Sequence, residues 1–170
     1  MKQFFYLVCA LLIAACGSTQ NRPDEEAPGQ PKLSERELPL PAFPKQENLL
    51  EFYVSELTSN HFYIDRLSLS VDPEGIVRYT MVVKTSGGAT NINYEAIRCA
   101  TRQIRLYATG RSDGTWSRAR ISEWREIENK LVNRHQAALN HDYFCPGGRP
   151  LVDAAEGIDA LRRGRHPEVQ

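Results

Sequence analysis

Apolar and polar residues alternate through the middle of the chain in the pattern of β-strands. Ser68 and Ser70 alternate with apolar residues, and a second alternating run follows the segment Asp72-Pro73-Glu74-Gly75. Two alternating runs joined by a Pro/Gly turn are typical of a β-hairpin. We therefore predict a hairpin over about residues 62–84. Its buried faces should carry five apolar side chains: Leu67, Leu69, Tyr79, Met81 and Val83.

Further strands are expected on both sides of this hairpin. Residues 91–99 form the next candidate strand, and residues 103–109 form another, with Ile104, Leu106 and Ala108 on one face. The pattern from Glu47 to Leu57 fits either a strand or a helical face, and the run Phe52-Tyr53-Val54 favours a strand. The middle of the chain thus predicts an antiparallel sheet of four to five strands.

Past Trp116 the spacing of apolar residues becomes helical. One helical stripe is formed by Ile121, Trp124, Ile127 and Leu131. Asn133, with Gln136 three residues later, is a candidate cap for a second helix over about residues 134–144. A last helix is expected to begin at Asp153. Strands followed by two or three C-terminal helices predict an α+β domain.

The N-terminus has the pattern of an export signal. Its apolar run from Phe4 to Ile13 is too short to cross a bilayer, which needs about 20 residues, and small residues follow it. The sequence Ile13-Ala14-Ala15-Cys16 resembles the end of a bacterial lipoprotein signal. We therefore expect residues 1–15 to be a signal peptide and Cys16 to be lipidated, with palmitate among its acyl chains. The alternative is an ordinary secretory signal, in which Cys9 and Cys16 are small buried hydrophobes.

Localisation follows from the same segment. In that class of lipoproteins an Asp directly after the lipidated cysteine resembles an inner-membrane retention signal, whereas this chain has Gly17. We expect outer-membrane sorting with the folded part in the periplasm. The lipid supplies the contact with the membrane, since two or more acyl chains give lasting attachment.

The stretch after Cys16 is rich in proline and charge and poor in large apolar residues, so it cannot bury enough surface to fold. We predict a disordered tether over residues 16–44, a single globular domain over 45–165, and a tail over 166–170. The whole chain has 21 basic and 21 acidic residues, and loss of Lys2 with the signal peptide leaves a charge of −1. This balance gives no reason to expect a nucleic-acid partner.

Two cysteines, Cys99 and Cys145, remain beyond the lipidation site. An even count in an oxidising compartment favours a disulfide between them. The alternative is a reactive thiol at Cys99, next to Arg98. There is no C-x-x-C spacing, and zinc would need further ligands at workable spacing. We expect no metal and no cofactor.

An arginine–aromatic group is the remaining candidate site. A guanidinium group binds carboxylate or phosphate and stacks on aromatic faces, so a small anionic ligand is one interpretation. The other is a solvated sheet face on which arginines pair with glutamates. Strand alternation places Arg98 and Arg102 on one parity and Arg105 on the other. The full group is Arg98, Arg102, Arg105, Tyr107 and Trp116.

Several motifs together resemble one family. They are Tyr94–Arg102, Tyr107–Gly110 and Asp113–Trp116, with Asn48–Val54 and Asn133–Leu139 fitting the same pattern. The chain resembles the cryptic-neisserial-protein-one-like family of proteobacterial lipoproteins over about residues 44–163. The resemblance implies an exported lipoprotein with paired cysteines, and it supplies no catalytic residue.

These observations predict a non-catalytic module that is anchored in the outer membrane, faces the periplasm and binds an envelope protein or another envelope component. The alternative function is a binder of a small anionic ligand through the arginine–aromatic surface. An enzyme is the third interpretation, because no nucleophile–base or carboxylate pair can be picked out of the sequence.

Overall fold

The computed structural model describes residues 38–169. The expected signal peptide 1–15, the lipidation site Cys16 and most of the tether 16–44 lie outside these residues. No helix within residues 38–169 has the length and apolar character needed to span a membrane.

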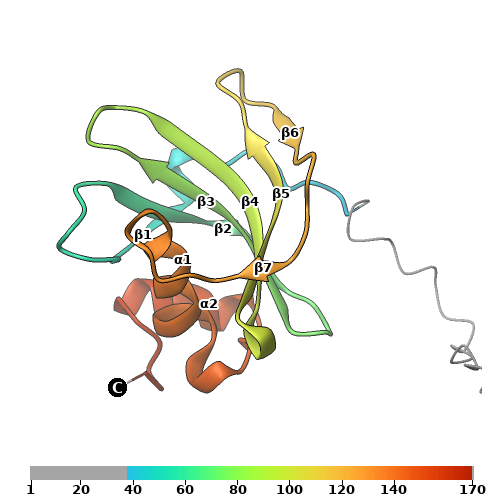
Figure 1. Cartoon of the computed structure of the whole chain (residues 1–170), viewed down its shortest axis with the longest axis vertical. Helices are drawn as coiled ribbons and strands as arrows, with labels where there is room; N and C mark the ends of the chain where they lie inside the picture. The colour runs from blue at the N-terminus through green and yellow to red at the C-terminus, as the bar shows by residue number, and fades with distance from the viewer. Residues whose placement is uncertain (1–37, 170) are drawn as a thin grey trace, which may run out of the picture. The chain divides into compact units, whose positions relative to one another are not determined.

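The described part of the chain forms a seven-stranded antiparallel sheet in which neighbours in the sheet are almost always neighbours in the chain. The order is β1-β2-β3-β4-β5-β6, and β7 also pairs with β5 (Figure 1). The antiparallel sheet is thus confirmed, but the prediction of four to five strands is too low. The bounds are β1 Leu49–Phe52, β2 His61–Val71, β3 Ile76–Lys84, β4 Thr90–Arg98, β5 Gln103–Gly110, β6 Trp116–Arg118 and β7 Arg125–Glu126.

The predicted hairpin is present as β2 and β3, and Asp72 builds its turn. Asp72 Oδ1 accepts hydrogen bonds of 2.9 Å from the backbone N–H groups of Glu74 and Ile76. Its other carboxylate oxygen accepts one of 2.8 Å from Arg78 Nη1. Gly75 has a φ of +74°, which a residue with a side chain rarely adopts. One carboxylate therefore closes the turn and pairs with a charge on the next strand.

The C-terminal helices cover one face of this sheet (Figure 1). Helix α1, Arg134–Ala138, continues directly into a π-helical segment, Leu139–Phe144, and helix α2 spans Ala154–Arg163. The Asp153 carboxylate caps α2 by accepting a 2.9 Å bond from the Glu156 N–H, at the start that was predicted. Asn133 precedes α1 as predicted, but its side chain makes no capping bond.

The main core lies between the helices and this face. Tyr79 and Met81 are fully buried against it, as predicted, and Leu69 joins the same cluster. Val83 is partly buried and packs at the edge of the cluster. Leu67 does not follow the prediction, because its side chain is 69% exposed.

A bulge in β2 explains the exposure of Leu67. Asp65 pairs with Thr80, but the next paired residue of β2 is Ser70, opposite Arg78, so β2 accommodates three extra residues. Inside the bulge the Ser68 hydroxyl accepts a 2.8 Å bond from the Thr80 N–H and donates one of 2.9 Å to the Asp65 carbonyl. This side chain replaces the missing strand partner, and Leu67 is left outside the alternation.

The helix predicted around residues 121–131 is wrong. This stretch is largely extended, contains only β7 and ends in a short 3₁₀ turn, Leu131–Asn133. The Ile127 N–H donates a 2.9 Å bond to the Arg102 carbonyl, which holds the stretch against the start of β5. Of the four apolar residues of the expected stripe, Ile127 is buried and Ile121 and Leu131 are exposed. The four apolar residues have helical spacing, but they do not form one continuous apolar face that a helix could bury.

The folded chain extends past both predicted boundaries. Trp116 Nε1 donates a 2.9 Å bond to the Pro41 carbonyl, and the Phe43 ring lies 5.3 Å from the Trp116 ring. Residues 38–44, assigned to the tether, therefore pack on the sheet face away from the helices. At the other end, His166 is buried and its N–H donates a 2.7 Å bond to the Asp142 carbonyl, so the expected tail 166–170 begins inside the fold.

Candidate functional site

Two of the predicted arginines lie together on the sheet face away from the helices. In the pairing of β4 with β5, Arg98 lies opposite Gln103 and Ala96 opposite Arg105, so both arginines point to the same side. The Trp124 ring lies between them, with the Arg98 guanidinium carbon 4.1 Å and the Arg105 guanidinium carbon 5.8 Å from its centroid. The parity expected to separate them is lost because a turn, Cys99–Thr101, intervenes between the strands.

Tyr107 belongs to the same surface, and it brings in an arginine that was not predicted. The guanidinium carbons of Arg105 and Arg78 lie 5.3 Å and 6.0 Å from the Tyr107 ring centroid. Arg78 is buried and forms the ion pair with Asp72 described above. The guanidinium groups therefore stack on rings and hydrogen-bond to neighbouring side chains, Ser122 among them.

Of the two other predicted residues, Arg102 lies away from this surface and Trp116 lies on it. Arg102 has a left-handed backbone conformation, with φ +50°, in the turn before β5, and it is exposed. It lines the cleft of about 440 Å³ beside Cys145. Trp116 lies farther along the same face as Tyr107, where it packs against Phe43 and Tyr94, and the Tyr94 ring is 5.4 Å from the Tyr107 ring. Four of the five predicted residues thus lie along one sheet face, and only Arg102 lies apart from it.

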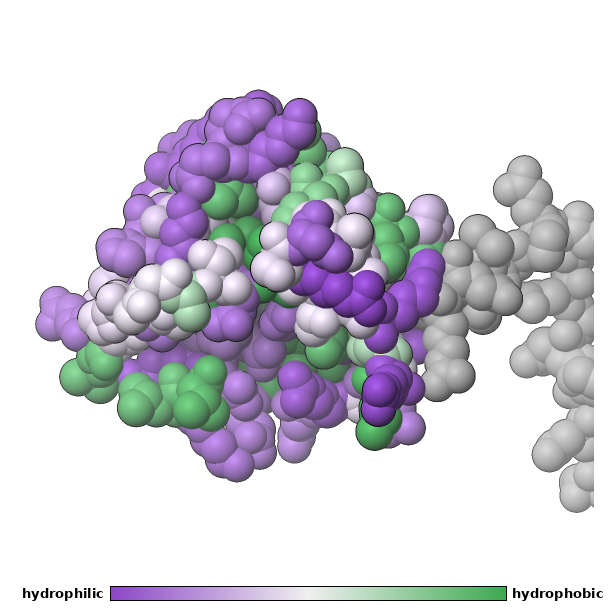
Figure 2. Space-filling model, turned by 90° about the horizontal axis from the view of Figure 1, so that it is seen from above, coloured by the Kyte–Doolittle hydropathy of each residue, from purple (hydrophilic) through white to green (hydrophobic). Residues whose placement is uncertain are grey.

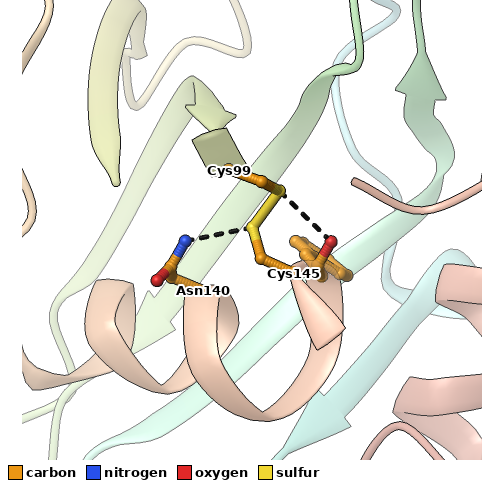
Figure 3. Close-up of a disulfide and its surroundings, with 4 residues drawn as sticks. Cys99, Asn140 and Cys145 are labelled. Atoms are coloured by element: carbon orange, nitrogen blue, oxygen red, sulfur yellow. Dashed lines mark hydrogen bonds between the residues drawn. A yellow bond between two sulfur atoms is a disulfide. The ribbon is translucent and has the colours of Figure 1, made fainter. Parts of the chain in front are cut away.

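The predicted disulfide between Cys99 and Cys145 is confirmed (Figure 3). Its sulfur atoms are 2.08 Å apart, and it joins the end of β4 to the end of the π-helical segment. Both cysteines are buried. Asn140 Nδ2 lies 3.0 Å from the Cys145 sulfur, on the side of the bond that faces the helix. Cys99 is therefore held in a structural link between the two layers of the core.

A cleft of about 590 Å³ opens at one end of the sheet. Three segments that are distant in the sequence surround it: the loop from β1 to β2, the facing ends of β3 and β4, and residues 131–135. Figure 1 shows the first two at the left of the view, where the β1–β2 loop lies beside the β3–β4 turn. This cleft was not among the sites predicted from the sequence.

The inner wall of the cleft is a pair of stacked rings. The His135 and Phe62 rings are 5.4 Å apart and nearly parallel, at 18°. Burial removes the imidazolium from water and lowers the pKa of His135 to about 4, so the ring is neutral at neutral pH. The neighbouring Arg134 extends along the wall, where its Nη1 donates a 3.2 Å bond to the Ser55 hydroxyl.

Carboxamide side chains supply much of the polar lining, from Asn60, Asn91 and Asn93. The Nδ2 of Asn93 donates a 3.1 Å bond to Oε1 of Glu95. Glu95 lies beneath the cleft in the core, and the Tyr79 hydroxyl donates a 3.3 Å bond to its other oxygen. Burial raises the pKa of Glu95, which stabilises its protonated form. The position of Asn93 is thus fixed by a buried carboxyl group.

The rim of the cleft is apolar and exposed. Leu57, Leu131 and Val132 line the cleft, and they are 72%, 65% and 77% exposed. In the space-filling view from above, hydrophobic surface is broken into separate patches among hydrophilic side chains (Figure 2). A local apolar rim around a partly polar cleft is typical of a binding site.

The described residues offer no constellation of metal ligands. Within residues 38–169, no three His, Cys, Asp or Glu side chains converge closely enough to hold a metal ion. His141 and Asp142 form an exposed pair at 2.7 Å. His61 pairs with Glu51 at 2.6 Å, also at the surface.

The sequence carries one weak indication of the cleft, in the polar residues of β4. Asn91, Asn93 and Glu95 alternate along β4 on the parity that faces the core, where apolar residues are the norm. Three polar side chains at such positions indicate a polar site at the end of a sheet. Nothing in the sequence, however, joined them to His135 and Ser55, which are about 40 residues away on either side.

Comparison with known proteins adds a family. The sequence pattern of the CNP1-like family matches residues 29–162. Cryptic neisserial protein 1 of Neisseria gonorrhoeae is 27% identical to the chain over 143 residues, which cover 75% of this chain and 70% of the relative. No solved structure matches.

Proposed function

The chain belongs to the CNP1-like family, and on that premise we propose that it is a lipoprotein of the outer membrane. Its folded domain faces the periplasm and binds a protein of the cell envelope. The protein acts as a non-catalytic module, and its contact with the membrane is the lipid on Cys16.

The segment around Cys16 supports the anchor. A short apolar run ends in Ile13-Ala14-Ala15-Cys16, and only a thiol at that position can form a thioether to lipid. The disulfide between Cys99 and Cys145 supports an oxidising compartment, because such bonds persist in the periplasm and are rare in the cytosol.

The cleft and its rim carry the proposal of a binding module. Leu57, Leu131 and Val132 expose aliphatic surface beside a cavity whose volume suits a ligand group. Binding of a partner that removes these aliphatic side chains from water is favourable by about 25 cal/mol per Å² of apolar surface buried. The stacked arginines on the other sheet face have neighbouring rings and side chains as partners, so we assign binding to the cleft instead.

The anchor can be tested by fractionation of cells. We expect a Cys16→Ser protein to accumulate as uncleaved precursor or to leave the membrane fraction. A Cys9→Ser protein should be processed and anchored normally, since Cys9 lies within the signal peptide. A Cys16→Ser protein that is processed and still partitions into detergent like the native protein contradicts the anchor.

The binding surface can be tested by photo-crosslinking in intact cells. A photoreactive amino acid at Val132 should give a discrete crosslinked product. The same amino acid at Val152, which is 85% exposed and lies outside the cleft, should not. Equal labelling from both positions, or none from Val132, contradicts the assignment of the partner to the cleft.

A further inference from the structure

We propose that the cleft binds the C-terminal end of a peptide whose last residue is apolar. The terminal carboxylate pairs with Arg134, the last side chain packs against Phe62 and Val83, and the backbone amides bond to the carboxamides of the lining. This inference rests on the proposed function, because it specifies what the binding module recognises.

The charge of the cleft selects a ligand with one negative charge. Arg134 is the only Arg or Lys among the described residues that line the cleft, and none of those residues is Asp or Glu. The adjacent His135 is neutral at neutral pH and adds no charge. The Ser55 hydroxyl, a neutral group, is the hydrogen-bond partner of Arg134 within residues 38–169. One guanidinium without a carboxylate partner matches one carboxylate, which it binds through two parallel hydrogen bonds.

The polar lining selects a peptide over a hydrocarbon chain. A carboxamide offers both donors and an acceptor, which is the combination that a peptide backbone presents. Asn93 uses one N–H on Glu95, so its carbonyl oxygen and second N–H are available to a ligand. A fatty acid would displace water from these groups without replacing its hydrogen bonds, so each group would be left unpaired at a cost in affinity.

The apolar part of the cleft suits the side chains of such a peptide. Phe62 and Val83 lie at the inner wall, and Val54 lies beside them. The volume of about 590 Å³ is within the range of about 300–1,000 Å³ of ligand sites. The rim residues Leu57 and Val132 extend the apolar surface outward, where they can contact the preceding peptide residue.

Fluorescence anisotropy with the full mature protein tests the proposal. The probe is a fluorescein-labelled peptide, Gly-Ser-Ala-Leu-Val, with a free C-terminal carboxylate, and the comparison is the same peptide with a C-terminal amide. We expect the amide to bind at least about tenfold more weakly, since a charge-assisted hydrogen bond contributes roughly 1.5–3 kcal/mol. The Arg134→Gln protein should bind both peptides with the weak affinity of the amide.

Matched variants separate recognition from folding. Arg165→Gln removes an exposed arginine that does not line the cleft, and it should leave binding unchanged. Arg134→Lys keeps the charge but loses the planar donor pair, so an intermediate affinity is expected. Thermal unfolding of each variant identifies any loss of binding that comes from loss of the fold.

Three outcomes would overturn the inference. Equal affinity for acid and amide excludes recognition of the carboxylate. Tight binding of laurate, with no binding of the peptide acid, assigns the cleft to a fatty acid. Peptide binding that survives Arg134→Gln places the site elsewhere. If any of these occurs while Val132 still crosslinks in cells, the peptide inference fails and the proposed function stands.

Discussion

The half-buried His135 and the buried Glu95 have shifted pKa values, and the two shifts have opposite effects on how stability depends on pH. Burial lowers the pKa of His135 to about 4 and raises that of Glu95. Between pH 6.5 and 4 the unfolded chain protonates His135 and the folded chain does not, so stability falls as the pH falls through this window. Above the ordinary pKa of a glutamate, the folded chain retains a proton on Glu95 that the unfolded chain has lost, so stability falls as the pH rises.

We expect the effect of His135 on the free energy of unfolding to be measurable below pH 6.5. The free energy of unfolding should decrease between pH 6.5 and pH 4 by up to about 3 kcal/mol through His135. A His135→Phe protein, which keeps a ring against Phe62, should lose most of this dependence. Urea titrations at a series of pH values measure the effect. The exposed His141→Gln is the control, and a slope that His135→Phe leaves unchanged would contradict the assignment.

At the scale of elements, the bulge in β2 decides which apolar side chains are buried. Ile64, before the bulge, and Leu69, at its far end, both face the core, so the strand returns to the same face with a different parity. Leu67 lies in the middle of the stretch 66–69, which has no partner residues on β3, and its side chain is exposed. Two leucines at alternate positions of one strand therefore have opposite environments.

A pair of substitutions tests this difference. Met81→Asp should destabilise the domain by several kcal/mol, because Met81 is 1% exposed and a charge there has no partner. Leu67→Asp should change stability by no more than about 0.5 kcal/mol, as is usual at the surface. Both values can be measured by thermal or urea unfolding. Comparable losses in the two proteins would show that the bulge does not expose Leu67.

The elements that could be predicted are those whose pattern had one simple cause. The β2–β3 hairpin follows from alternation and from a turn that one aspartate closes, and α2 follows from its cap at Asp153. The conformation of residues 121–131 could not be predicted. Ile127 packs into the main core, and the spacing of apolar residues around it does not indicate this contact. The bulge could not be predicted either, because the Ser68 hydroxyl takes the place of a backbone acceptor for the Thr80 N–H only when β3 lies beside β2.

The candidate site was harder to predict than the fold. Strand parity predicted that Arg98 and Arg105 lie on different faces, and only the turn Cys99–Thr101 brings them to one side. The contribution of Trp124 also required the tertiary structure. The cleft joins three segments that only the complete sheet brings together. Its ring pair, Phe62 and His135, is separated by more than 70 residues in the sequence.

At the scale of the whole molecule, the disulfide joins the sheet to the helical layer. It connects cysteines 46 residues apart, at the end of β4 and just before Pro146. The entropic treatment of such a loop gives a stabilisation of at most about 4 kcal/mol. This bond and the apolar core hold the helices on the sheet, together with two 3.2 Å hydrogen bonds between the Tyr143 hydroxyl and the backbone of Tyr53.

Protein isolated from cells without reductant should therefore contain neither thiol in free form. When it is unfolded in denaturant with an alkylating reagent, Cys99 and Cys145 should remain unlabelled until a reductant is added. The protein Cys99→Ser/Cys145→Ser should unfold at lower denaturant concentration. Labelling of both cysteines without reductant would contradict the link and return Cys99 to consideration as a reactive thiol.

The order of strands in the sheet has a consequence for how the domain assembles during synthesis. Because each strand from β2 to β6 pairs with the one before it, the sheet can grow in the order in which the chain emerges. The residues that cover its core face come last, after residue 130. Until they arrive, Tyr79, Met81 and Ile97 are open to water on a nearly complete sheet, and Cys99 has no partner. The nascent chain therefore passes through a stage in which a chaperone that shields apolar surface is of most use. This stage ends when the helical residues cover the sheet and Cys145 pairs with Cys99.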